Sequence, residues 1–130
     1  MLNFISFGSG SSGNCYYLYN QDDSLMIDVG VGLRTLKKHF YNYGLRLSDV
    51  QNIIVTHDHA DHIKSAGSIS KEFNIPVYAT ERVHQGLDHN YCIRAKIPVD
   101  YKRIVAYGQT VLVGHFAVTP FHVPHDSQDN

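Results

Sequence analysis

The chain has 130 residues, of which 43% are hydrophobic and 18% are charged, and this composition is typical of one globular domain with a buried core. The formal net charge is −1 at pH 7, so the overall charge does not indicate a nucleic-acid-binding protein. A neutral average can still contain a local basic face, which leaves a polyanionic substrate open.

The first part of the chain predicts three short strands, over residues 2–7, 15–19 and 25–29. The loop 8–14 (GSGSSGN) and the polar turn 20–23 connect them, and short strands with tight connections indicate an antiparallel meander. Apolar residues then recur three or four positions apart over residues 33–43, which predicts an amphipathic helix that ends at Gly44.

Residues 53–56 (IIVT) form a continuously apolar run, which predicts a strand that is buried on both faces. A second helical stripe follows over 63–73, then a strand over 76–79 and a helix over 80–87 with Thr80 as its N-cap. Residues 88–102 have no clear period and predict a loop. Further short strands are expected at 104–105, 110–113, 116–119 and 121–123.

Four residues of metal-ligating types directly follow the strand 53–56, namely His57, His59, Asp61 and His62 in the pattern H-x-H-x-D-H. Residues two apart in an extended segment can point to the same side, so His57 and His59 can converge on one metal ion. Asp61 and His62 lie one turn further on and can face a second ion. The alternative is a polar turn that happens to contain histidines, which this density of ligands next to an apolar strand disfavours. Histidine with aspartate suits zinc, and also manganese or iron.

A catalytic zinc ion usually has three protein ligands and one position open to water, so a third histidine is needed. His125, in the segment FHVPHDS after a predicted strand and Pro124, is the stronger candidate, and His122 is its rival. Asp28 ends a predicted strand just before Gly30. It is either a turn residue or an acceptor that holds a ligand histidine by its remaining N–H.

Other candidate sites are weaker. The loop 8–14 lacks the Walker pattern and precedes a strand, so a hairpin connection is favoured over a phosphate cradle. Cys15 is expected to be a packed thiol. Four late basic residues have the charge to contact phosphates, although a solvated loop is the simpler interpretation: Arg94, Lys96, Lys102 and Arg103.

The cellular setting is predicted to be the reducing cytoplasm. The start of the chain has no basic region, and Ser6 and Gly8 interrupt its apolar run, which argues against a signal peptide. No stretch has the length of a membrane span. Cys15 and Cys92 are too few for a disulfide framework.

The order of four segments resembles the WalJ/YycJ-like branch of the metallo-β-lactamase superfamily. These segments are SFGSGSSGNCYYL, LMIDVGVG, IVTHDHADHI and FHVPHDS, and together they extend over essentially the whole chain. The resemblance implies the α/β (α+β) class, with an αββα sandwich and a two-metal site between its sheets. It also implies a metal-dependent hydrolase, specifically a phosphodiesterase or DNA exonuclease.

The same resemblance assigns roles to individual residues. His57, His59 and His125 match the histidine ligands of the first metal, and Asp61 and His62 match ligands of the second. Asp28 matches a supporting aspartate. A water between the two metals, Zn or Mn with Fe as a further candidate, would be the nucleophile, and Asp61 would orient it.

The family fold continues after the late histidine with a second sheet, a bridging aspartate and a final histidine. The resemblance therefore implies that residues 1–130 form a single domain equivalent to the N-terminal half of that fold. One consequence is a site that holds only one metal in this chain. Another is a homo-oligomer that covers the open sheet. The alternatives to a phosphodiesterase are a non-catalytic metal-binding or interaction module, and a thioester or lactone hydrolase.

Overall fold

The computed structural model describes residues 1–90, 93 and 95–121, so both candidates for the third histidine, His122 and His125, lie outside the described residues. Within this part of the chain the elements are β1 (Asn3–Gly8), β2 (Cys15–Tyr19), β3 (Ser24–Ile27), α1 (Leu33–Asn42), the 3-10 helix η1 (Leu47–Asp49), β4 (Ile53–Ile54), α2 (Ala60–Ile63), α3 (Ala66–Phe73), β5 (Val77–Ala79), α4 (Glu81–His89), the 3-10 helix η2 (Val99–Tyr101), β6 (Lys102–Ile104), β7 (Val111–Val113) and β8 (Phe116–Val118).

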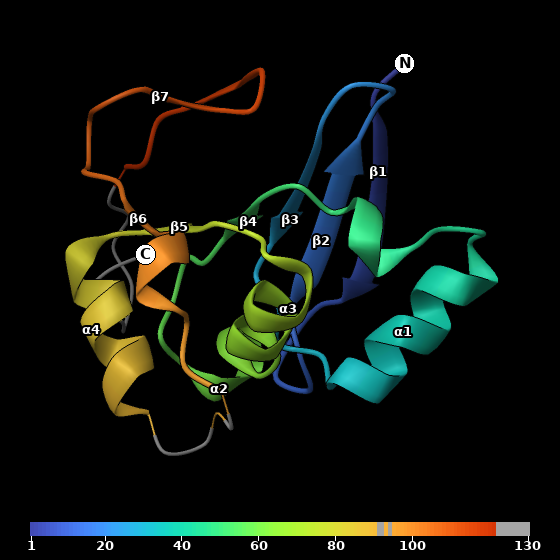
Figure 1. The fold of residues 1–130 in the computed structure, drawn as a ribbon, viewed down its shortest axis with the longest axis horizontal. Helices are drawn as coiled ribbons and strands as arrows, with labels where there is room; N and C mark the ends of the chain where they lie inside the picture. The colour runs from blue at the N-terminus through green and yellow to red at the C-terminus, as the bar shows by residue number, and fades with distance from the viewer. Residues whose placement is uncertain (91–92, 94, 122–130) are drawn as a thin grey trace.

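The described strands form a mixed sheet in the order β1-β2-β3-β4-β5-β6 and a separate hairpin of β7 and β8. The first three strands are antiparallel, which confirms the predicted meander, and β3 to β6 are parallel. In Figure 1 the β7–β8 hairpin lies on the opposite side of the molecule from α1. No helix in the described part of the chain is long and apolar enough to cross a membrane.

Most predicted elements are found within two residues of their expected bounds. Two confirmed details are the cap of α4, where Val83 N–H donates to Thr80 Oγ1 at 3.2 Å, and the end of α1, where Gly44 has φ 70°. Of the strand expected at 121–123, only Phe121 is described, and it is not in a strand.

The helical stripe over 63–73 differs from its prediction because two helices, α2 and α3, share it. An unbroken helix would pair the Asp61 carbonyl with the Ser65 N–H. Instead Asp61 O accepts from Asn14 N at 2.7 Å, and Ser65 N donates to Val29 O at 2.9 Å. Bonds to distant segments thus replace one turn of helix, and they tie α2 to the loops that follow β1 and β3.

The sheet has two different faces because successive strand residues point in opposite directions. One row across the sheet, Met26, Ile53 and Val77, is fully buried. This row belongs to the core that also contains Leu36, Phe40, Ile63, Ile69, Val83 and Leu87 from the helices. The alternate row, Ile27, Ile54 and Tyr78, lies on the other face, where β7 and β8 are placed. The helices therefore cover one face only.

One buried histidine links a helix to the edge of the sheet. His84 of α4 is 3% exposed, and its Nε2 lies 2.9 Å from the carbonyl oxygen of Arg103 in β6. Burial lowers the pKa of His84, the hydrogen bond to Arg103 opposes this, and the positive charge of Lys102 lowers the pKa further. The net pKa is below the ordinary value, so the folded protein keeps this imidazole neutral.

This histidine should make the protein less stable in mild acid. The unfolded chain takes up a proton as the pH falls below about 6.5, while the folded His84 resists it. Its contribution to stability is therefore complete above about pH 6.5 and is lost below it, by at most about 1.4 kcal/mol per pH unit. We expect urea unfolding between about pH 7.5 and pH 5.5 to show a steeper loss in the wild type than in His84→Gln, whose amide keeps the donor but does not titrate. Equal slopes in the two proteins would contradict this assignment.

Candidate metal centre

The motif residues lie where two neighbouring parallel strands end. Asp28 directly follows β3, and Thr56 and His57 follow β4. The carboxyl ends of parallel strands are the usual position of ligand sites in open α/β sheets. After His57 the chain stays extended to His59, the N-cap of α2, and the helix then carries Asp61 and His62.

Asp28 is the centre of a buried hydrogen-bond network. It is 3% exposed and has φ 61°, a left-handed conformation that aspartate tolerates better than most residues. Its Oδ1 accepts from the Thr56 backbone N–H at 2.7 Å. Its Oδ2 lies 2.7 Å from both the Thr56 hydroxyl and Nδ1 of His62. Three donors therefore converge on one carboxylate.

These bonds determine which ring nitrogen of each histidine carries the proton. An ionised carboxylate only accepts, so His62 must donate from Nδ1 to Asp28. The Thr56 hydroxyl gives its single proton to Asp28 and then accepts from Nδ1 of His57, 2.8 Å away. In the neutral form of both rings the lone pair is consequently on Nε2, the form that binds a metal ion.

The two rings lie close together and next to negative charge. The ring centres of His57 and His62 are 4.2 Å apart, and ligand atoms of Asp28, His57 and His62 all lie within 4.8 Å of one another. Burial lowers the pKa of His62, but its hydrogen bond to Asp28 and the charges of Asp28 and Asp61 outweigh this and raise the pKa overall. The donor set of this cluster fits a divalent cation, whose charge would offset both carboxylates.

Asp61 is held by a residue from the loop between β1 and β2. Its Oδ2 lies 3.8 Å from Nε2 of His62 and 3.3 Å from Nδ2 of Asn14. Asn14 is buried, its amide nitrogen also donates to Asp61 O at 3.1 Å, and its carbonyl accepts from Gly30 N at 2.8 Å. The loop is thus a hairpin connection, as expected, and it also supports the site.

Sequence reasoning missed Asn14 and Thr56 as parts of this site. Asn14 ends the GSGSSGN loop, and Thr56 stands between the apolar strand and the first histidine. Neither residue type is a typical metal ligand, so a search for ligands passes over both. A signal for them was that each directly adjoins a strand end at which a ligand was expected.

The other sequence-predicted ligands have looser or undescribed positions. His59 is about half exposed, and its Nε2 lies 3.9 Å from Asp58 Oδ1. The ring centres of His57 and His59 are 5.9 Å apart, close to the roughly 5 Å expected for two imidazoles on one tetrahedral zinc. Their sharing of one ion stays a prediction, as does the role of His125.

The remaining candidates lie away from the cluster or are chemically quiet. Asp58 packs against α4, where a Cβ added at Gly86 would lie 2.2 Å from its Oδ2. Cys15 is fully buried, and burial followed by the charge of Asp28 raises its pKa to about 12. Cys15 is therefore a packed thiol, as expected, and not a thiolate ligand. His39 stacks on Phe7, with ring centres 5.8 Å apart.

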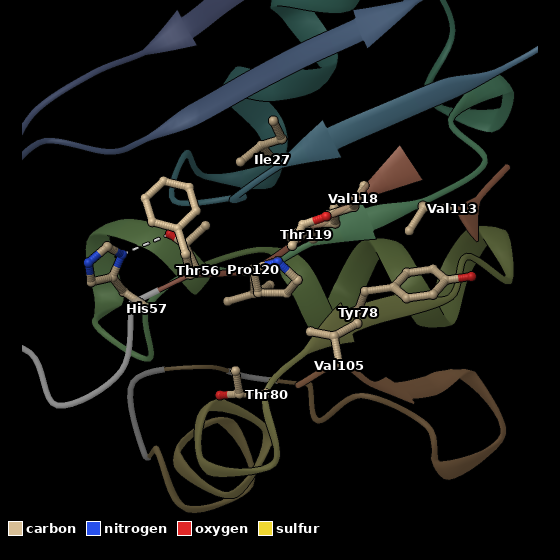
Figure 2. Close-up of a pocket in the computed structure, with 13 residues that line it drawn as sticks. Ile27, Thr56, His57, Tyr78, Thr80, Val105, Val113, Val118, Thr119 and Pro120 are labelled. Carbon is tan, nitrogen blue, oxygen red and sulfur yellow. Dashed lines mark hydrogen bonds between the residues drawn. The ribbon is translucent and has the colours of Figure 1, made fainter. Parts of the chain in front are cut away.

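A pocket of about 390 Å³ opens beside His57 on the face of the sheet that the helices leave uncovered. Figure 2 shows His57 at one end of this pocket, with Thr56 beside it, and Tyr78 and Val113 towards the other end. Its walls are mainly apolar side chains, including Ile27, Ile54 and Val118. The histidine cluster thus adjoins an apolar, concave surface, a common setting for ligand sites.

Comparison with known proteins identifies the family. The sequence profile described as "Metallo-beta-lactamase superfamily" matches residues 8–128. The chain is 34% identical over 128 residues to the exodeoxyribonuclease YycJ of Bacillus anthracis, covering 98% of the chain and 47% of that protein. It is 29% identical over 119 residues to the exodeoxyribonuclease WalJ of Streptococcus pneumoniae, covering 92% of the chain and 44% of that protein.

Solved structures agree on the fold. The crystal structure of the metallo-β-lactamase SMB-1 bound to 2-mercaptoethanesulfonate aligns with a TM-score of 0.76 and 22% identity, covering 98% of the chain and 53% of SMB-1. This likeness confirms the predicted fold class. The chain spans about half the length of the curated relatives it matches.

Proposed function

Because the chain belongs to the metallo-β-lactamase superfamily, we propose that it is a metal-dependent hydrolase that cleaves phosphodiester bonds, with DNA as its substrate. The observation that carries the proposal is the network of Asp28, which prepares His57 and His62 as neutral Nε2 ligands at one strand end. The choice of DNA rests on the relatives, which are named exodeoxyribonucleases.

We assign His57, His59 and His125 to one metal and Asp61 and His62 to a second. Asp28 already accepts three hydrogen bonds, so its role is to hold ligands and not to bind the ion directly. Zinc and manganese both suit this donor set, and iron is a further candidate. If no other segment completes the second site, the chain holds one ion. We place the protein in the cytoplasm, and a homo-oligomer over the uncovered sheet face stays a prediction.

The residues divide the chemical work in a simple way. Divalent metals in such a site lower the pKa of water and polarise a phosphoryl oxygen. Asp61, fixed through its Oδ2 by the Asn14 amide, would orient the attacking water. Thr56 and Asp28 would keep the two imidazoles from turning, which maintains the site ready for the ion. The apolar wall beside His57 would limit competing water.

Asp61→Asn should lower the rate of hydrolysis of bis(p-nitrophenyl) phosphate by about 10²–10⁴-fold, because the carboxylate that orients water is lost. The measurement is release of nitrophenol by the purified chain loaded with Zn²⁺ or Mn²⁺, together with its metal content. Asp100→Asn, on the exposed η2, removes the same charge and should leave the rate unchanged.

Each other outcome favours a different function. Unchanged hydrolysis in Asp61→Asn would disprove the role of Asp61. Metal uptake by the wild type without turnover would favour a non-catalytic metal-binding or interaction module. Turnover of a thioester or lactone without phosphodiester hydrolysis would favour that class of substrate.

A further inference from the structure

A second hollow, with a very different lining, lies on the helical side of the candidate metal centre. It has a volume of about 630 Å³ and is lined by Gly32, Arg34, Lys37, Lys64, Ser65 and Ser68, with Leu33. We call it the basic pocket. It contains three cationic side chains and two serines, and none of its described lining residues is acidic. The whole chain has 11 basic and 12 acidic residues, so this pocket is a local concentration of positive charge.

The basic pocket and the metal centre are built on the same junction. Lys64 follows His62 by two residues, and Gly32 follows Asp28 by four. Ser65 joins the two segments, because its N–H donates to Val29 O at 2.9 Å and its hydroxyl donates to Val31 O at 2.7 Å. Figure 1 shows the start of α1 and the short α2 meeting below the sheet. The cations are thereby held at a fixed place beside the cluster.

The charges of this pocket are available to a ligand. Lys37 faces Glu72 at 3.4 Å, but both side chains are about half exposed, so the pair is weak. Arg34 and Lys64 are exposed and form no ion pair within the described residues. The first turn of α1 has no acidic residue, and its N-cap Gly32 supplies no side-chain hydrogen bond, so the positive end of this helix adds to the field.

We propose that the basic pocket binds phosphates of the DNA strand outside the bond that is cleaved. This inference rests on the proposed function for the identity of the strand, but the binding itself needs no metal. An arginine fork with lysines and serine hydroxyls is a set of groups suited to phosphate oxygens. Contacts of this kind position a strand without reading its sequence.

The test is the affinity of the metal-free chain for a fluorescein-labelled single-stranded oligodeoxynucleotide, measured by anisotropy in chelator across a salt series. In Arg34→Gln/Lys64→Gln, the affinity should fall about fivefold per side chain at about 0.1 M salt, and the slope of log affinity against log salt should fall by about 0.7 per contact. The matched control Lys38→Gln/Arg82→Gln removes the same charge from exposed positions on α1 and α4 outside the pocket and should change both values little. Circular dichroism melting checks that each variant folds.

Two results would overturn the proposal. One is an equal loss of affinity, or none, in the pocket variant and the control. The other is retained DNA binding together with lost binding of inorganic phosphate, which would assign the pocket to a small anion. Hydrolysis of bis(p-nitrophenyl) phosphate by the pocket variant separates this inference from the proposed function. That small substrate lacks a strand to bind, so its rate should be that of the wild type.

Discussion

Replacement of Gly30 by alanine should lower the free energy of unfolding by about 3 kcal/mol, from overpacking and the loss of hydrogen bonds. Gly30 lies where three segments meet, and a Cβ there would be 1.8 Å from the carbonyl oxygen of Asp61 and 2.8 Å from the backbone nitrogen of Asn14. Both neighbours are backbone atoms, so no side-chain rotation relieves the clash. The junction itself must open, which breaks the bonds Asn14 N to Asp61 O and Gly30 N to Asn14 O.

The measurement is urea unfolding at neutral pH, followed by circular dichroism. Gly32→Ala is the matched control two residues away, where the nearest atom to an added Cβ is the flexible end of Lys64 at 3.9 Å. Because Gly32 is the N-cap of α1, the control should lose less than about 1 kcal/mol. Similar stabilities for the two variants would mean that the junction around Gly30 is not as tight as the structure indicates. We also expect Gly30→Ala to bind metal more weakly, since Asp61 moves with its carbonyl.

The elements that local sequence determines were predicted well. The aromatic segment CYYLY gives β2 at its expected bounds, and Thr80 caps α4 through a bond of only three residues' span. The periods of 2 and 3.6 residues depend on near neighbours alone, so they can be recognised in one segment. The buried run IIVT likewise indicated a strand between two parallel neighbours.

The parts that were missed depend on residues far apart in the chain. The break between α2 and α3 requires carbonyl and amide partners at Asn14 and Val29, more than thirty residues away. The contact of Asn14 with Asp61 joins positions 47 apart. The proximity of His57 to His62 requires Asp28 to hold both through Thr56, which alternation along one strand does not reveal. Local patterns therefore located the ligands but not the groups that orient them.

Asp28→Asn should weaken metal binding by about 10–100-fold, the usual effect of removing a group that orients a metal ligand. Asparagine tolerates the left-handed conformation at φ 61°, so the backbone should be preserved. Its amide offers one oxygen where the carboxylate offers two, and three donors from Thr56 and His62 converge there. One N–H or O–H therefore loses its acceptor. If His62 Nδ1 is the donor that loses, its proton is free to move to Nε2, and the ring can no longer bind metal through that atom.

The measurement is Zn²⁺ affinity by competition with a chromophoric chelator, and the control is Asp22→Asn, which removes the same charge from an exposed turn. The control should bind metal as the wild type does. The Asp28 variant should also lose about 1–3 kcal/mol of stability in chelator, because a buried donor is left unpaired. The two readouts answer different questions. Lost stability with unchanged Zn²⁺ affinity would make Asp28 a purely structural residue. Lost affinity beyond the control indicates that the carboxylate prepares His62, and through Thr56 also His57, for the ion.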